Sequence, residues 1–312
     1  MEVARAALAP APASESAAAA TAVAADAPSR ATDFLELTKP RITALVLVTA
    51  AVGYAVGTPG AFDTPRFVLF LIGTALLCGG ASALNQFAER DADAKMARTS
   101  RRPIPAGRLR PEEALRFGLA LCVTGLAALA GVNLPTLLLG AASVLSYVLA
   151  YTPLKRRTTA ALLVGAVPGA APPLLGWVAV TGQADPGALA LFLIILVWTP
   201  PHFWALAIHR RDEYARAAIP MLPVTHGVAF TCGRILFYAV LLWAVSLLPF
   251  AIGIGHGLYL AGACVLGARF VERAWRLRGD ERFAMPTFRY SIVYLAALFA
   301  LLLLDHWLSG AS

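Results

Sequence analysis

The chain has 312 residues, of which 59% are hydrophobic and 14% are charged, and its formal net charge is +8. A soluble core cannot bury so large a share of apolar residues, so the composition excludes an ordinary water-soluble domain and predicts a membrane protein. No RNA- or DNA-binding motif interrupts the apolar segments, so the positive charge does not indicate nucleic acid. We therefore expect a lipid bilayer as partner and no nucleic acid.

The N-terminal segment, residues 1–33, is rich in Ala, Pro and Ser and carries scattered acids. Proline and acidic residues break any continuous apolar core, and arginine is scarce, so neither a signal peptide nor a mitochondrial transit peptide fits. We predict a disordered tail, followed over residues 34–312 by a single transmembrane domain.

Nine apolar segments are long enough to cross a bilayer as helices, which predicts an all-α polytopic membrane protein. They cover residues 41–58, 65–88, 113–131, 133–151, 159–180, 187–208, 231–252, 256–274 and 288–308. Of the 26 Lys and Arg residues, only Arg66 lies in a connection assigned to the far side. The positive-inside rule therefore predicts a cytoplasmic N-terminus and a C-terminus on the opposite side of the membrane.

The most polar stretch, Asn85 to Gly107, directly follows the second span. Asn85, Glu89 and Asp93 recur every four residues, so a helix would place them on one face, each about 40° from the last. A strip of cations follows, formed by Lys95, Arg98, Arg101, Arg102, Arg108 and Arg110. Mg²⁺ prefers hard oxygen ligands together with substrate phosphates, and Arg and Lys bind the remaining phosphate charge. The pattern predicts a magnesium-bound diphosphate, although the basic residues taken singly could serve only to fix topology.

The loop after the fourth span lies on the same predicted side of the membrane as this motif. It offers Lys155 and Arg156, which could bind a diphosphate or act as plain positive-inside anchors. The four cysteines lie in or beside apolar segments without ligand spacing, so we interpret them as small core residues.

The end of the sixth span carries a second set of candidate residues at that surface, namely His202, Arg210, Asp212 and Tyr214. An ionisable residue inside apolar sequence is a functional candidate by default, although His202 could equally be hydrogen-bonded packing. Asp212 could bind a second Mg²⁺, orient Arg210 or form an ordinary loop ion pair.

With these residues assembled, the chain resembles the UbiA superfamily of intramembrane aromatic prenyltransferases. The superfamily motif has the form Asn-x-x-x-Asp-x-x-x-Asp followed by Arg-Thr-x-x-Arg-Pro, and it is matched here by Asn85, Glu89, Asp93, Arg98, Thr99, Arg102 and Pro103. Glu89 replaces the first Asp and keeps a carboxylate. Other segments resemble the subfamily that farnesylates haem: 36–43, 91–96, 154–158, 201–208, 220–223 and 291–294.

This sequence departs from the family pattern at two places. The superfamily's second acidic motif is reduced to Asp212 with His202 and Arg210 nearby, which leaves a second metal open. Ala161 stands where the subfamily pattern has Asn.

The resemblance implies a nine-helix bundle around a lateral cavity. Farnesyl diphosphate would place its tail among apolar helices and its head on Mg²⁺ held by Asn85, Glu89 and Asp93. The residues that would bind the diphosphate are Lys95, Arg98, Arg102, Lys155, Arg156, Arg210 and Tyr214, and among them Arg98, Arg102, Lys155 and Arg156 would neutralise its charge as it leaves. Such chemistry requires cations and a metal more than a protein nucleophile.

The resemblance further implies a vinyl group of haem b as acceptor and haem O as product, in a bacterial plasma membrane. His202 would contact haem or shuttle a proton, Asp212 would assist catalysis, and a haem A synthase or an oxidase assembly factor would be a partner. Three alternatives remain: a quinone-type aromatic acceptor, an anion transporter, and a non-catalytic assembly factor. A transporter would often show inverted repeats, and a scaffold would not need aligned carboxylates.

Overall fold

A computed structural model describes residues 29–96, 99–155 and 157–310 of the protein. These residues form helices joined by loops, with no strand among them. The first, α2 (Arg30–Leu37), is capped by the Ser29 hydroxyl and begins three residues before Asp33, where ordered structure was predicted to start. Residues 1–28, which make up most of the predicted tail, and the predicted site residues Arg98 and Arg156 lie outside the described residues.

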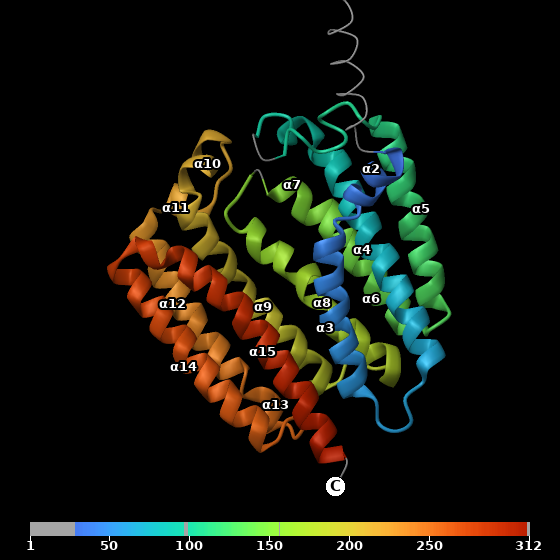
Figure 1. Ribbon diagram of the computed structural model, residues 1–312, viewed down its shortest axis with the longest axis vertical. Coiled ribbons are helices and arrows are strands. Elements are labelled where there is room, and N and C mark those ends of the chain that lie inside the picture. Colours follow the sequence, from blue (N-terminus) through green and yellow to red (C-terminus); the bar gives the residue numbers. More distant parts are fainter. Residues whose placement is uncertain (1–28, 97–98, 156, 311–312) are drawn as a thin grey trace, which may run out of the picture.

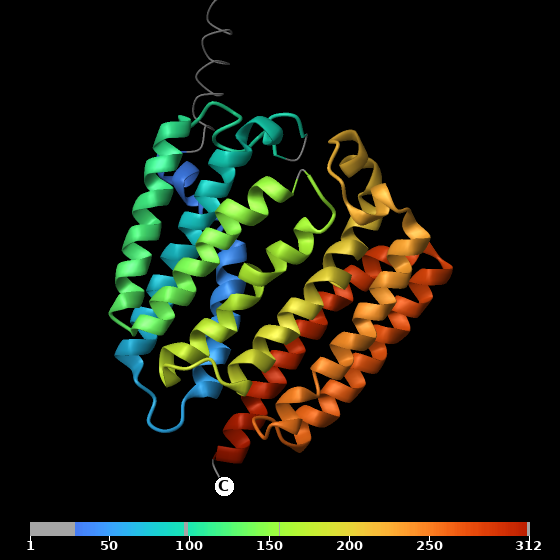
Figure 2. The same ribbon diagram turned by 180° about the vertical axis from the view of Figure 1, so that it is seen from behind.

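The helices form two halves that lie side by side (Figures 1 and 2). The first half contains α2, α3 (Pro40–Gly57), α4 (Thr64–Asp93), α5 (Pro111–Ala130), α6 (Leu134–Leu145), the π-helix η1 (Ser146–Tyr151), α7 (Thr152–Leu154) and α8 (Ala161–Thr181). The second half contains α9 (Pro186–His209), α10 (Arg211–Arg216), α11 (Leu222–Thr225), α12 (Val228–Val245), α13 (Leu248–Ala251), α14 (Gly257–Gly279), the 3₁₀-helix η2 (Glu281–Phe283) and α15 (Ala284–Gly310).

Eight helices of the described chain are long and apolar enough to cross a membrane, one fewer than the nine predicted spans. The difference is α14, which has 23 residues and packs beside α12 and α15. Its second half carries Arg269, Glu272, Arg273, Arg276 and Arg278, which lower its hydropathy. The all-helical polytopic fold is therefore confirmed, and the predicted number of apolar spans is slightly too high.

Large apolar side chains face outward along the bundle. Leu45, Val123 and Val265 are 66%, 67% and 70% exposed. Exposed apolar surface on this scale would be unfavourable in water but is stable against lipid, where helices also satisfy their own backbone hydrogen bonds. The protein is an integral multi-pass membrane protein.

Helices α3 and α8 pack with their backbones in close contact. A Cβ atom at Gly53 would lie 2.1 Å from the carbonyl oxygen of Pro173, and one at Gly176 would lie 2.1 Å from that of Ala50. Small residues allow such an approach between membrane helices. This contact fixes α8 opposite α4, on the far side of the cavity described below.

The polar connections gather at one end of the bundle. The end of α4, the loop to α5, α7 and the α10–α11 segment all lie at the top in Figure 1, and the C-terminus lies at the bottom. This arrangement brings both predicted polar motifs to the same end.

Candidate active site

The polar end of α4 extends the apolar helix by two turns. Asp63 caps the helix by accepting a hydrogen bond from the Arg66 backbone N–H, and the helix runs unbroken to Asp93. Because four residues are slightly more than one turn, Asn85, Glu89 and Asp93 fall on one face. All three are buried, with 3%, 8% and 4% of their surface exposed. The predicted convergence of one amide and two carboxylates is present.

A basic side chain from elsewhere in the chain meets each of these groups. Lys155 Nζ lies 3.0 Å from Glu89 Oε1 and 3.1 Å from Oε2. Arg102 donates to Asp93 Oδ2 at 2.5 Å. Buried carboxylates are stable only when paired, so these cations compensate the two charges in the absence of a ligand.

The segment after α4 folds back so that Arg102 reaches Asp93. The Thr99 hydroxyl donates to the Asp93 carbonyl oxygen at 2.9 Å, which satisfies a carbonyl at the helix end. The Arg102 backbone N–H then donates to the Thr99 carbonyl at 3.0 Å. The segment from Thr99 to Arg102 thus forms a tight turn that holds the Arg102 guanidinium against the acidic face.

Lys39 is a further cation that the sequence interpretation did not place in the site. Its Nζ donates to Asn85 Oδ1 at 3.3 Å, across 46 positions of sequence. Its backbone is left-handed, with φ of 49°, and turns the chain from α2 into α3. Burial, and next the charge of Arg102, lower the pKa of Lys39 from 10.5 to about 8. A strained backbone that holds a half-buried lysine beside an amide oxygen favours a binding role.

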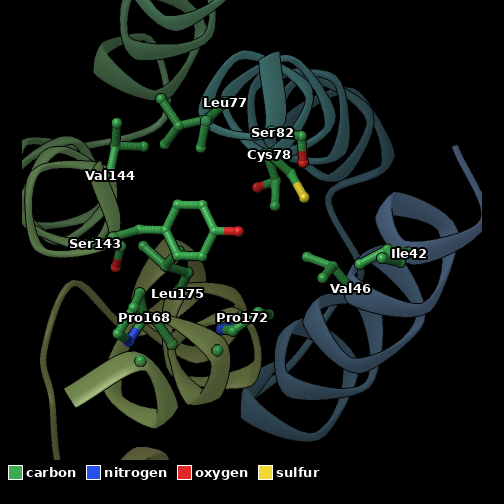
Figure 3. A pocket seen from close by; sticks show the side chains of 16 residues that line it. Ile42, Val46, Leu77, Cys78, Ser82, Ser143, Val144, Pro168, Pro172 and Leu175 are labelled. Atoms are coloured by element: carbon green, nitrogen blue, oxygen red, sulfur yellow. The ribbon is translucent and has the colours of Figure 1, made fainter. Parts of the chain in front are cut away.

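Two cavities are lined by residues of this polar cluster or by the helices that carry it. One, of about 190 Å³, is mainly apolar and lies between α3, α4, α6, η1 and α8; Figure 3 shows side chains from these segments around it, including Cys78, Ser82, Val46 and Leu175. We call it the tail cavity. The other, of about 170 Å³, has Asp93 in its wall and is closed by the α10–α11 segment. We call it the acceptor cavity; its lining further includes Arg102, Tyr151, Lys155, Phe203, Trp204, Tyr214 and Met221.

Two tyrosines of the π-helix η1 lie where the cavities approach each other. The rings of Tyr147 and Tyr151 are stacked with their centroids 5.4 Å apart. Tyr147 lines the tail cavity, and Tyr151 lines the acceptor cavity. The next residue, Thr152, accepts a hydrogen bond from Asn85 Nδ2 at 3.2 Å. π-Helical turns often occur at functional sites, and this one joins the acidic face of α4 to both cavities.

His202 is not brought to this cluster. Its Nδ1 lies 2.6 Å from the Ser291 hydroxyl on α15, and its ring is stacked on Trp198 with centroids 4.1 Å apart. The ring of Phe288 lies 4.7 Å away on another side. These contacts correspond to the hydrogen-bonded packing alternative that the sequence left open.

The remaining predicted site residues differ in their positions. Asp212 is exposed and faces its neighbour Arg211 at 3.6 Å, outside the cluster. Lys95 is exposed near the end of α4, and Arg210 is partly buried between α9 and α10. Tyr214 lines the acceptor cavity, so it is the member of the second polar motif that the structure brings to the site.

The cluster also accommodates the predicted metal. Among the described residues no group of three or more His, Cys, Asp or Glu side chains could hold a metal ion. A metal in this cluster would therefore need the amide oxygen of Asn85 as well as Glu89 and Asp93. Amide and carboxylate oxygens are ligands that Mg²⁺ accepts, and the donor set leaves room for substrate phosphates and water. The residues present fit a Mg²⁺–diphosphate pair.

The protein is a polytopic helical bundle whose buried acidic helix face is paired with cations, and this is what an intramembrane prenyltransferase would require to bind a diphosphate. The model of the UbiA prenyltransferase family matches residues 46–298. The protoheme IX farnesyltransferase of Marinobacter nauticus is 50% identical over 279 residues, which cover 88% of this chain and 92% of that protein. Protoheme IX farnesyltransferase 1 of Pseudomonas putida is 51% identical over 280 residues, covering 88% and 94%. The chain belongs to the UbiA prenyltransferase family.

Solved structures support the fold independently of close sequence similarity. A structure of digeranylgeranylglyceryl phosphate synthase aligns with a TM-score of 0.78 at 18% identity, over 88% of this chain and 98% of that one. A UbiA homologue from Archaeoglobus fulgidus, solved with GPP and Mg²⁺, aligns with a TM-score of 0.58 at 17% identity, over 86% and 99%.

Proposed function

We propose that this protein transfers the farnesyl group of farnesyl diphosphate to a vinyl group of haem b and so makes haem O. The observation that carries the proposal is the buried acidic face of α4, which is paired with cations. The α4 residues before this face line the tail cavity, and Asp93 lines the acceptor cavity. The choice of farnesyl and haem rests on relatives about half identical to this chain over most of its length.

In this proposal Asn85, Glu89 and Asp93 hold Mg²⁺, which supplies charge to polarise the phosphate oxygens. Lys155 and Arg102 already lie against the two carboxylates, and on substrate binding they would turn to the diphosphate oxygens. Lys39, which donates to Asn85, adds a third cation from the start of α3. Lys95, Arg98, Arg156, Arg210 and Tyr214 remain further candidates for diphosphate contact. The solved UbiA homologue with GPP and Mg²⁺ supports metal use in this fold.

The reaction breaks the bond between C1 of the farnesyl group and the diphosphate oxygen. Lys39, Arg102 and Lys155 stabilise the negative charge that builds on the leaving diphosphate. The vinyl group attacks C1, water adds to the cation left on the vinyl carbon, and a proton is released. The stacked rings of Tyr147 and Tyr151 line the route between the cavities and offer π-faces to the allylic cation. Farnesyl diphosphate, haem b and water thus give haem O and diphosphate.

We assign His202 to the packing of α9 against α15 and Asp212 to an exposed ion pair. The proposed location is the bacterial plasma membrane, with a cytoplasmic N-terminus and the C-terminus on the opposite side. Support for this topology comes from the alternating basic connections and from the positions of α2 and the C-terminal end of α15 at opposite ends of the bundle (Figure 1). A haem A synthase or an oxidase assembly partner stays a prediction.

The direct test incubates the purified full-length protein in detergent with haem b, farnesyl diphosphate and Mg²⁺, with an EDTA control. The proposal predicts a Mg²⁺-dependent product with the mass of haem O. Diphosphate release with a quinone precursor such as 4-hydroxybenzoate, but not with haem, would retain the chemistry and overturn the acceptor. No transfer to either acceptor would favour a transporter or an assembly factor, which counterflow in proteoliposomes and complementation after loss of both carboxylates would distinguish.

A further inference from the structure

Gly169 lies in α8 at a position where no neighbouring atom is close enough to require a glycine. Glycine in a helix interior costs about 1 kcal/mol relative to alanine, so a close contact usually explains its presence. On the same helix, a Cβ at Gly176 would meet a backbone oxygen at 2.1 Å and one at Gly165 would meet the Tyr151 ring at 2.4 Å. A Cβ at Gly169 would meet no atom within 4 Å. The open space in front of Gly169 therefore needs a different explanation.

Part of that open space is the tail cavity, because Gly169 is exposed and is among the residues that line the cavity. Its neighbours Pro168 and Pro172 line the same wall, and both point towards the residues of the other helices in Figure 3. The cavity is apolar apart from a few hydroxyl groups, so it suits a hydrocarbon chain and not a polar ligand.

The depth of the cavity follows from helix geometry. Along α4, Asn85 at the polar cluster and Thr74 at the deepest α4 position of the lining are eleven residues apart, which is about 16 Å at the helical rise. That span is close to the length of an extended chain of three isoprene units. Along α8, Gly169 lies about 6 Å below Gly165 and about 9 Å above Leu175, near mid-depth.

Thr74 marks the closed end of this path. It is only 4% exposed, and its Oγ1 has no hydrogen-bond partner among the described residues. Because this oxygen is already inaccessible, Thr74 limits the path as part of the cavity wall and not through the loss of a solvated hydroxyl. The cavity is thus open at mid-depth and ends at a polar group.

We propose that Gly169 sets the length of prenyl chain that the protein accepts, by leaving a passage through which the distal isoprene units reach the deep end of the tail cavity. The proposal rests on the proposed function, because it takes the ligand of this cavity to be the donor's hydrocarbon chain. A side chain at position 169 would not clash with any neighbouring protein atom but would occupy the passage. A larger side chain would obstruct the prenyl chain more.

The experiment compares the wild type with Gly169→Ala, Gly169→Val and Gly169→Leu, using dimethylallyl, geranyl, farnesyl and geranylgeranyl diphosphates with haem b and Mg²⁺. One methylene in an apolar pocket changes discrimination by about 10- to 200-fold. We expect Gly169→Leu to lower kcat/KM for farnesyl diphosphate at least about tenfold while the value for geranyl diphosphate changes less than about threefold, with Val and Ala intermediate. Thr74→Ala should improve geranylgeranyl diphosphate relative to farnesyl diphosphate.

The matched control is Gly233→Leu. Gly233 in α12 also has no atom within 4 Å of a built Cβ, but it does not line the tail cavity. It should leave the ranking of donors unchanged. An unchanged farnesyl-to-geranyl ratio in Gly169→Leu would overturn the proposal and would mean that Gly169 faces lipid.

A second readout separates this proposal from the proposed acceptor. Thermal stabilisation by non-hydrolysable thio-diphosphates of the four lengths reports donor binding without any acceptor. If haem is not the acceptor, the wild type should still be stabilised most by the farnesyl analogue, and Gly169→Leu should shift the optimum to a shorter chain. The same optimum in both proteins would contradict the role of Gly169 whatever the acceptor is.

Discussion

The polar ends of α4 and α9 carry similar residues at the same end of the bundle, but their environments differ. At the end of α4, Glu89 and Asp93 are buried; Glu89 meets Lys155, 66 positions away in the sequence, and Asp93 meets Arg102 in the turn that follows the helix. Just after α9, in α10, Asp212 is 86% exposed at the side chain, and its ion pair among the described residues is with its neighbour Arg211. Charged residues in a sequence motif therefore indicate a site only when their burial is known. Exposed ion pairs contribute little to stability, whereas a buried charge is stable only when an opposite charge or hydrogen bonds compensate it.

The largest expected effect comes from neutralising the acidic face. Glu89→Gln or Asp93→Asn keeps the side-chain shape but removes a metal-binding charge, so turnover should fall about a hundredfold or more. Asp212→Asn is the matched control and should stay within about threefold of the wild type. We would measure the initial rate of prenyl transfer for each variant. Size-exclusion elution would show whether each variant is folded. Equal losses in Asp212→Asn and Asp93→Asn would contradict the contrast between the two ends.

Removing the cation that pairs with the buried carboxylate Glu89 should lower activity more than removing the cation that pairs with the exposed Asp212, although the loss should be smaller than for the carboxylates themselves. Lys155→Met removes the partner of Glu89 and a diphosphate contact, each a charge-assisted hydrogen bond worth about 1.5–3 kcal/mol. We expect kcat/KM for farnesyl diphosphate to fall about tenfold to a hundredfold. Arg211→Met, which loses only the exposed partner of Asp212, should change it little. Steady-state kinetics with varied donor would reject our assignment if the two variants behaved alike.

Lys39 provides a pH test of the polar cluster. Burial and the charge of Arg102 lower its pKa to about 8, so it is positive below that pH and loses its charge as the pH rises through it. Donor kcat/KM should therefore decline between about pH 7 and 9. Lys39→Arg keeps the charge over this range and should remove the decline. An unchanged profile in Lys39→Arg would exclude Lys39 as the titrating group.

The smallest effect on catalysis is expected at His202. His202→Phe keeps a ring beside Trp198 but loses the hydrogen bond to Ser291, at a cost of about 1–3 kcal/mol in stability. The thermal midpoint should fall while donor KM stays unchanged. Ser291→Ala should have a similar effect, and the double variant should not add the two losses, because the pair forms one interaction. A selective loss of haem-dependent turnover with a normal midpoint would instead restore His202 to the site.

The sequence was sufficient for the parts of the site that depend on local periodicity. A spacing of four residues after an apolar run was enough to align Asn85, Glu89 and Asp93, because helix geometry fixes the relation between neighbours on one face. Lys39 was missed because its contact with Asn85 joins two helices, although a lysine before proline at the start of an apolar helix was a usable signal. Asp212 was predicted as a site residue because of its charge and its place after the sixth span. The short helix α10 instead turns its carboxylate outward, which the sequence pattern did not indicate.

The fold shows the same division. Hydropathy identified the long helices but overcounted the apolar spans by one, because α14 joins an apolar half to a charged half. The π-helical turn at Ser146–Tyr151, which positions Tyr147, Tyr151 and Thr152, left no mark in the hydropathy pattern. The two cavities depend on which helices are neighbours, and that information lies in long-range packing.

The central claim is that the acidic face of α4 is where metal and diphosphate bind. It is tested most directly by crystallising the protein with Mn²⁺ in place of Mg²⁺ and a farnesyl thio-diphosphate, and measuring anomalous scattering from manganese. We predict a manganese peak among Asn85, Glu89 and Asp93, with the diphosphate facing Lys39, Arg102 and Lys155. A peak beside Asp212 alone, or a diphosphate bound away from α4 without metal, would contradict the account.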